Sequence, residues 1–332
     1  MENFNVRVLS KENIEAAASG KTILIGEHSV VYGYKALAMA VPDINLSVTI
    51  EAVYKDNILI CTEDMEVDWL HVWHMVLLNK VIPIEERLKK LLLQSFEKAL
   101  ALVEFPYTLS ECIPQKIHIH SQIPLGGGMG GSAAISTCLV RIAAQVAKVK
   151  LSLEKQIQFA NEVDCLFHNG SASGLDVSAV ASDGIIEFKK GSPIKKLENK
   201  CHFWLALIDS GERSETAQMV KKVKNYLDEN PVFVEGLFHK LDNLASSCSI
   251  LLEQGNVIKF SECLNEAHDY LVQLGVSTLK MDNIVHELKK HGALAAKLTG
   301  AGGGGLVLSV FTKKPEFLFE QYGENNVYVS HV

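Results

Sequence analysis

The stretch IPLGGGMGGSAAIS, residues 123–136, places five glycines within six positions and follows them with a serine and two alanines. Glycine loses more backbone entropy on folding than any other residue, and it adds no side chain to a core. A strand-like run, QKIHIHSQI (115–123), precedes the glycines. We therefore expect a ligand to come close to the backbone of this loop, because side chains would hold it away.

The residues after the glycines repeat with the spacing of a helix. Ile135, Leu139, Ile142, Val146 and Val149 follow one another at steps of four, three, four and three residues, which predicts one apolar helix face. In a strand, glycine loop and helix, backbone N–H groups and the positive end of the helix dipole face an anion. The segment therefore predicts a phosphate-binding loop.

Composition limits what the rest of the chain can be. Hydrophobic residues make up 48% of the 332 residues and charged residues 21%, so a sizeable core is possible. The formal net charge is −7 without a Lys/Arg-rich tract, so we expect neither nucleic acid nor a membrane as a partner. The seven cysteines are scattered without a Cys-x-x-Cys pair, and the N-terminus has no signal-peptide pattern. We expect a cytoplasmic globular protein.

The pattern elsewhere predicts a mixed α+β protein in two domains. Residues 20–34 are too interrupted by glycine for one regular element, and the lysine-rich segment 189–200 is the expected domain boundary. The other expected elements are strands over 14–19, 35–41, 44–54, 57–62, 184–188 and 203–209, helices over 85–104 and 152–167, mainly helices over 214–291, and a strand–glycine–strand segment over 294–310.

Two well-known phosphate loops do not fit the 123–136 segment. A Walker loop requires Lys-Ser/Thr after its last glycine, whereas Gly131 is followed by Ser132 and Ala133. Gly126, Gly128 and Gly131 satisfy G-x-G-x-x-G, but the dinucleotide fingerprint also requires an acidic residue at the end of the next strand. A second helix is expected there instead, so both interpretations are disfavoured.

Three segments resemble, in the same order, the three motifs of the GHMP small-molecule kinases. SGKTILIGEHSVVYG (19–33) is similar to the first motif, PLGGGMGGSAA (124–134) to the second and AKLTGAGGGG (296–305) to the third. HNGSASGLD (168–176) and IDSGERSETAQMV (208–220) resemble segments of one family within them, the mevalonate kinases. The resemblance implies the GHMP kinase fold. That fold has an N-terminal α/β domain, here residues 1–190, and a C-terminal ferredoxin-like α+β domain, here residues 198–332.

The chain departs from the family pattern at two places. Gly131 stands where the family usually has the first of two serines. The segment 168–176 is one residue longer than its counterpart, and the position of the magnesium-binding glutamate of the family is taken by Asp164. Glu162 lies two residues earlier, so the resemblance leaves both carboxylates as candidates for the metal.

The resemblance also implies roles for individual residues. Asp176 would accept or orient the proton of the substrate hydroxyl, and Lys21 would pair with it and favour the alkoxide. The substrate would contact Lys21, Glu27, His28, Asp176, Thr299 and Gly300. The phosphates of ATP would contact Pro124, Gly126, Gly127, Gly128, Gly130, Gly131, Ser132 and Ala133, with Thr299, Gly300 and residues 302–305 closing over them. Mg²⁺ would be held by Ser132 and Asp164, with Glu162 as the second choice. Each assignment has a structural alternative, since Ser132 could only cap the helix and Asp176 could only stabilise a turn.

The activity implied by the resemblance is ATP- and Mg²⁺-dependent phosphorylation of the C5 hydroxyl of (R)-mevalonate, a step of isoprenoid biosynthesis, by an enzyme that is often a homodimer. Another GHMP kinase, acting on phosphomevalonate or a sugar, is the nearest alternative. A phosphomevalonate kinase should carry extra Lys or Arg near the substrate, and GEHSVVYG (26–33) has none. The other alternative is a catalytically silent relative that binds ATP or a metabolite, which the joint presence of Lys21, Ser132, Asp164 and Asp176 disfavours.

Overall fold

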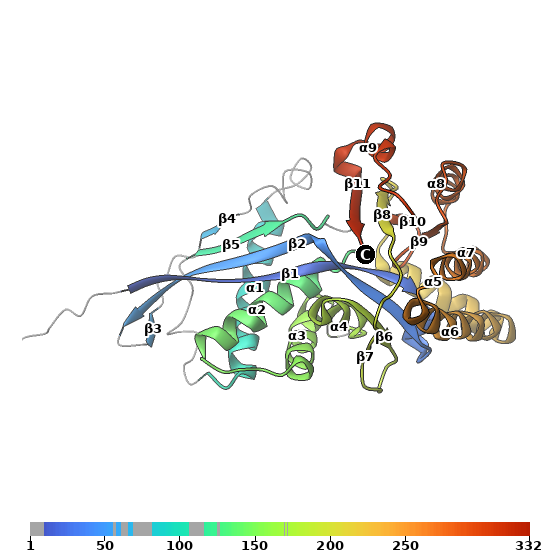
Figure 1. Cartoon of the computed structure of the whole chain (residues 1–332). Coiled ribbons are helices and arrows are strands. Elements are labelled where there is room, and N and C mark those ends of the chain that lie inside the picture. Colours follow the sequence, from blue (N-terminus) through green and yellow to red (C-terminus); the bar gives the residue numbers. More distant parts are fainter. Residues whose placement is uncertain are drawn as a thin grey trace, which may run out of the picture. The chain divides into compact units, whose positions relative to one another are not determined.

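The computed structural model describes residues 10–55, 58–60, 66–68, 82–105, 116–124, 127–168, 170 and 172–332. They form two compact units, each assembled from separate segments of the chain (Figure 1). The first unit contains Met1–Ala18, Asn45–Gln122 and Ser132–Ala172, and the second contains Ser19–Ile44, Ile123–Gly131 and Ser173–Val332. No helix in the described part of the chain is long and apolar enough to cross a membrane.

Two long strands, β1 (Ser10–Ile25) and β2 (Ala36–Lys55), each contribute residues to both units. The expected end of the first strand at Ser19 was wrong, because β1 continues to Ile25. The expected break between residues 41 and 44 was also wrong, because β2 runs through Pro42. Pro42 lies between the stretch of β2 that pairs with β6 and the stretch that pairs with β5, so its missing N–H removes no hydrogen bond to either.

In the first unit, the second half of β2 pairs antiparallel with β5 (Lys116–Ser121), in the register Leu46↔Ser121 to Glu51↔Lys116. The strand β3 (Ile58–Ile60) pairs with β2, and β4 (Glu66–Asp68) pairs with β5. The helices of this unit are α1 (Ile82–Leu102), α2 (Gly131–Val146) and α3 (Leu153–Phe167). The first residue of α2, Gly131, is the last residue of a segment of the second unit. Helix α1 packs against α3. Helix α2 ends before Val149, which was expected on its apolar face and is instead exposed.

In the second unit, the first half of β2 pairs antiparallel with β6 (Ile185–Phe188), which also pairs with the short β7 (Lys195–Lys196). Helix α4 (Leu175–Ser182) precedes β6. One apolar cluster joins Ile23 of β1, Ala36 of β2, Leu175 of α4 and Ile186 of β6. This shared core holds β1 beside the first turn of α4, and so brings a lysine of β1 close to an aspartate of α4.

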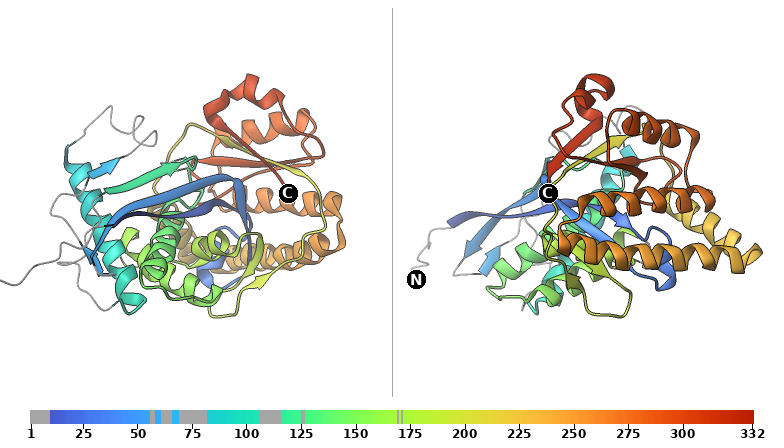
Figure 2. Two further views of the ribbon diagram at one scale, coloured as in Figure 1. Left: turned by 60° about the vertical axis from the view of Figure 1, so that its left-hand side comes forward. Right: turned by 45° about the vertical axis from the view of Figure 1, so that its right-hand side comes forward.

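The rest of the second unit contains a four-stranded antiparallel sheet in the order β11-β8-β10-β9. Its elements are β8 (Trp204–Asp209), α5 (Thr216–Glu229), α6 (Pro231–Gln254), α7 (Val257–Gln273), α8 (Leu279–Lys290), β9 (Ala295–Leu298), β10 (Leu306–Phe311), α9 (Phe317–Tyr322) and β11 (Val327–His331). Helices α6 and α7 lie side by side (Figure 2), and α7 and α8 pack against β9. The strand order is that of a ferredoxin-like sheet. It confirms the expected α+β organisation of this region.

Candidate active site

A half-buried ion pair joins β1 to the start of α4. The Lys21 ammonium lies 2.9 Å from the Asp176 carboxylate, and the Lys21 side chain is 3% exposed against 38% for Asp176. The backbone N–H of Lys21 donates a hydrogen bond to the Met129 carbonyl at 3.0 Å. Asp176 occupies the first turn of α4, where backbone N–H groups favour a carboxylate. The geometry therefore presents a fixed cation beside a partly open carboxylate.

The same pair lines a cavity of about 160 Å³ within the second unit. Its other lining residues include Glu27, His28, Gly128, Ser173, Thr216, Gly300 and Ala301. A larger depression of about 540 Å³ lies at the start of α6, but its lining of Asn230, Pro231, Val232, Phe233, Gly236, Leu237 and Lys240 holds no carboxylate. Acid–base chemistry requires a carboxylate or a comparable group. The smaller cavity is therefore the candidate active site.

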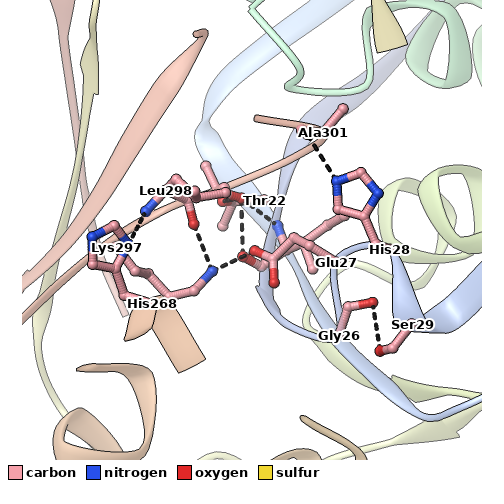
Figure 3. A network of polar contacts seen from close by, with 11 residues as sticks. Thr22, Gly26, Glu27, His28, Ser29, His268, Lys297, Leu298 and Ala301 are labelled. Atoms are coloured by element: carbon pink, nitrogen blue, oxygen red, sulfur yellow. Dashed lines mark hydrogen bonds and ion pairs between the residues drawn. The ribbon is translucent and has the colours of Figure 1, made fainter. Parts of the chain in front are cut away.

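His28 is held in an unusual backbone conformation beside this cavity. Its φ of 61° and ψ of −50° are rare for a residue with a side chain and usually mark a functional site. Its Nε2 lies 2.8 Å from the Ala301 carbonyl oxygen, so Nε2 carries the proton and donates it (Figure 3). Burial lowers the pKa of His28, although the hydrogen bond to Ala301 acts in the opposite direction. A neutral His28 leaves Nδ1 as a hydrogen-bond acceptor.

Glu27 is fully buried beside His28. Burial raises its pKa, and the neighbouring ammonium of Lys297 acts against that rise. Lys297, on β9, donates a hydrogen bond to Glu27 Oε1 and another to the Leu298 carbonyl at 2.7 Å (Figure 3). Sequence reasoning missed Lys297. The available signal was a single charged residue inside the apolar strand pattern LAAKL (294–298), which requires either an exposed position or a buried partner.

The glycine loop divides into positions with different requirements. Gly128 has φ +82°, lines the cavity, and has nothing within 4 Å of the place where a Cβ would stand. Gly130 has φ +73°, and a Cβ there would lie 2.8 Å from Cγ of Lys21. At Gly127 a Cβ would meet Pro124 at 2.9 Å. Gly128 therefore leaves room for a ligand, whereas Gly130 makes room for Lys21.

The remaining residues expected around the phosphates have mixed placements. Gly126 lies outside the described residues. Helix α2 begins at Gly131, so Ser132 and Ala133 belong to its first turn. The amides at the start of this helix have no carbonyl partner within the helix and remain available to an anion.

Three glycines of the C-terminal glycine segment, at positions 302–304, lie too close to other parts of the protein to carry a side chain. A Cβ on Gly302 would lie 2.2 Å from the Val276 carbonyl oxygen, and side chains at 303 and 304 would collide with residues 212–214 or Met219. Gly300 differs, since nothing lies within 4 Å of its Cβ position and it lines the cavity. Thr299 is buried, and its hydroxyl contacts Thr22 and the backbone of β1 instead. Close packing against protein therefore explains glycines 302–304 without a phosphate.

The candidate metal ligands belong to the first unit. His168 Nε2 lies 3.0 Å from the Ser132 hydroxyl and 3.6 Å from an Asp164 carboxylate oxygen. The Asp164 side chain is 3% exposed. Glu162 instead forms an ion pair of 2.9 Å with Lys98 of α1. The hydroxyl of Ser132 and the carboxylate of Asp164 thus gather around one histidine, and Glu162 faces a different helix.

Comparison with known proteins identifies the family. Residues 92–184 match the sequence family described as the GHMP kinases N terminal domain, and residues 249–326 match GHMP kinases C terminal. A mevalonate kinase of Thermococcus sibiricus is 31% identical over 90% of this chain and 89% of its own length. The chain belongs to the GHMP kinases.

This GHMP kinase is also 31% identical to a mevalonate kinase of Archaeoglobus fulgidus, over 92% of this chain and 95% of the relative. Its fold is similar to that of L. major mevalonate kinase crystallised in complex with R-mevalonate, with a TM-score of 0.79 and 23% identity, covering 98% of this chain and 97% of the other. The expected family and fold are confirmed, and membership of this kinase family implies the use of ATP. Both matched segments fall within the expected domains 1–190 and 198–332, whose boundary stays a prediction.

Proposed function

We propose that this GHMP kinase transfers the γ-phosphoryl group of ATP to the C5 hydroxyl of (R)-mevalonate, giving 5-phosphomevalonate and ADP. The observation that carries the proposal is the Lys21–Asp176 pair, 2.9 Å apart, in the cavity lined by Glu27 and His28. Eight curated relatives that each match about nine-tenths of the chain are all named mevalonate kinase. A substrate hydroxyl beside Asp176 would have both a proton acceptor and a cation within reach.

Asp176 and Lys21 carry the catalytic roles in this proposal. As the hydroxyl oxygen bonds to the γ-phosphorus, its proton passes to an Asp176 carboxylate oxygen, and the bond between the γ-phosphorus and the ADP oxygen breaks. The Lys21 ammonium stabilises the negative charge that develops on the attacking oxygen. Because Lys21 is nearly buried, water screens that charge little. Positioning and charge neutralisation are the main requirements of phosphoryl transfer.

The remaining residues of the cavity position the two substrates. Mevalonate would contact Glu27, His28 and Gly300, with Thr299 holding the strand beside them. The ATP phosphates would lie against the amides of the loop and the first turn of α2, which together comprise Pro124, Gly126, Gly127, Gly128, Gly130, Gly131, Ser132 and Ala133. The open space at Gly128 supports this placement, since a side chain there would occupy the approach of a phosphate.

Magnesium fits the oxygen ligands of the first unit. Mg²⁺ prefers carboxylate and hydroxyl oxygens and needs only one or two protein ligands. A larger site is not found, since within the described residues no group of three or more His, Cys, Asp or Glu side chains could hold a metal. Asp164 and Ser132 supply such oxygens around His168, whereas the Glu162 carboxylate is occupied by Lys98. We therefore assign the metal to Asp164 and Ser132. When bound, Mg²⁺ would neutralise charge on the phosphates.

An ADP-release assay tests the proposal directly. Purified protein with ATP and Mg²⁺ should release ADP when (R)-mevalonate is added, and should not do so with phosphomevalonate, galactose or buffer. Turnover of phosphomevalonate or a sugar instead of mevalonate would reassign the substrate, and ATP binding without turnover of any substrate would indicate a silent relative.

We also propose a cytoplasmic location, because the five cysteines that the structure describes are all free thiols.

A further inference from the structure

The ion pair between Lys297 and Glu27 is the most deeply buried charge arrangement among the described residues of the cavity wall. Both side chains are 0% exposed. Lys297 lies on β9, Glu27 follows β1, and 270 positions of sequence separate them (Figure 3). Glu27 lines the cavity, and its Oε2 has no hydrogen-bond partner. The pair therefore reaches the site through Glu27, whereas Lys297 is not among the residues that line the cavity.

Such a pair is costly to maintain. Removing two charges from water costs several kcal/mol each, and well-packed apolar residues of similar volume often stabilise a protein as well or better. Removing one partner alone is far worse, because it leaves a single buried charge without compensation. Stability of the core by itself is thus a weak explanation for a lysine in the apolar run LAAKL. The neighbouring charges give a better one.

Four charged side chains form two ion pairs at the cavity. Lys297 contacts Glu27, and Lys21 contacts Asp176. The positive charge of Lys21 also acts on Glu27, in the same direction as Lys297 and more weakly. Lys21 therefore interacts with two carboxylates, with Asp176 at 2.9 Å and, more weakly, with the buried Glu27. Lys297 supplies the positive charge that pairs with Glu27, so Lys21 is not needed for that purpose and can pair with Asp176.

We propose that Lys297 is a positioning residue for the phosphoryl-transfer reaction, acting through Glu27: its ammonium compensates the Glu27 carboxylate, so that Lys21 remains paired with Asp176. This inference rests on the proposed function for its kinetic consequences. Without Lys297, the fully buried Glu27 carboxylate can stay ionised only if another cation approaches it, and Lys21 is the ammonium that lines the same cavity. Lys21 would then turn toward Glu27 and leave Asp176.

The other groups around Lys297 do not offer a comparable role. Its second hydrogen bond goes to the neutral carbonyl of Leu298. Burial lowers the pKa of His268 to about 4, with Lys297 contributing, so this neighbour is neutral near pH 7. The pKa of the nearby Cys248 thiol is raised, so it is neutral as well. Glu27 is thus the group whose charge depends on Lys297.

A double-mutant cycle separates this role from simple support of the core. The variants are Lys297→Met, which keeps the length of the side chain without its charge, Glu27→Gln, and the two together. Lys222→Met is the matched control, because the exposed Lys222 ammonium donates to the Gly275 carbonyl at 2.6 Å and forms no ion pair with any described residue. For each variant we would measure kcat, the KM values for mevalonate and ATP, and the distance between Lys21 Nζ and Asp176 in a crystal structure.

The expected results are specific to charge compensation. Lys297→Met should lower kcat by about tenfold or more, the usual coupling within a contacting network, with the KM for ATP little changed. Its Lys21–Asp176 contact should open from 2.9 Å to a separation without an ion pair. The double variant should recover activity relative to Lys297→Met, because no uncompensated carboxylate remains to attract Lys21. Lys222→Met should behave like the wild type.

Several results would overturn the inference. A double variant no more active than Lys297→Met, or an intact Lys21–Asp176 contact in Lys297→Met, would show that Lys297 does not act through the Glu27 charge. If Lys297→Met fails to fold, the inference requires that the double variant folds and is at least as active as Glu27→Gln. If the double variant also fails to fold, Lys297 is needed only for folding of the core. The crystallographic distance needs no turnover, so a wild-type protein inactive on mevalonate would refute the proposed function without deciding this inference.

Discussion

Adding one methyl group at either of two neighbouring glycines should produce two different defects. Gly128 and Gly130 both have positive φ, at +82° and +73°. Alanine in the left-handed region costs about 1–2 kcal/mol, so both Gly128→Ala and Gly130→Ala should lose at least that much unfolding free energy, and Gly130→Ala should lose more because its Cβ would meet Lys21. Any difference between them in ligand binding or turnover therefore reports what the added Cβ meets.

The surroundings of the two Cβ positions predict the difference. At Gly128 the Cβ meets no protein atom within 4 Å and occupies space on the cavity wall, so the affinity for MgATP should fall about tenfold or more, equivalent to about 1.4 kcal/mol. At Gly130 the Cβ would lie 2.8 Å from Cγ of Lys21. Ordinary carbon contacts begin at about 3.5 Å, so the Lys21 side chain must move by about 0.7 Å. A displacement of that order can reduce kcat by about 10²-fold.

Calorimetric titration with MgATP and steady-state kinetics with mevalonate would measure both effects. Gly128→Ala should raise the Kd for MgATP and leave kcat at saturation closer to that of the wild type. Gly130→Ala should show the reverse, and its thermal unfolding temperature should fall at least as far as that of Gly128→Ala. Unchanged MgATP affinity in Gly128→Ala would refute the phosphate role of the loop. An equal loss of affinity in both variants would refute the assignment of Gly130 to Lys21.

Three further predictions concern other parts of the site. Asp176→Asn should lower kcat by about 10²-fold or more while leaving MgATP affinity nearly unchanged, because proton handling contributes about 10²–10⁴; titration and turnover of one preparation would check this, and an unchanged kcat contradicts the assignment. Asp164→Asn should raise the Mg²⁺ concentration needed for half-maximal activity, and Glu162→Gln should not, since Lys98 binds its carboxylate; the opposite ranking would move the metal to Glu162. Burial lowers the pKa of His268 from 6.5 to about 4. The unfolded chain therefore takes up a proton on this histidine at a higher pH than the folded chain, and the free energy of unfolding should fall by roughly 3 kcal/mol as the pH falls from 6.5 to 4. Unfolding free energies measured over that range should decline less in His268→Gln, and equal declines would contradict the buried neutral histidine.

Local pattern was sufficient for much of the fold. The helix over residues 152–167 and the strand–glycine–strand segment near the C-terminus match α3, β9 and β10 closely. Their periodicity arises within a few residues and does not depend on distant partners. The strands β1 and β2 were expected, but their full lengths were missed, because glycine and proline usually interrupt a strand. Whether they do so depends on which backbone groups the neighbouring strands use, and that is decided by pairing far along the chain.

The glycine segments show the same division at the site. By itself, the sequence determined that the chain carries a strand–glycine–helix loop and the ordered motifs of a small-molecule kinase, because those signals depend on backbone freedom and spacing. Only the tertiary structure decided what each glycine faces: open cavity at Gly128, Lys21 at Gly130, and the Val276 carbonyl at Gly302. It also decided that Lys297 compensates Glu27. Contacts between residues 270 positions apart leave no local pattern, because they exist only once the core has brought the strands together.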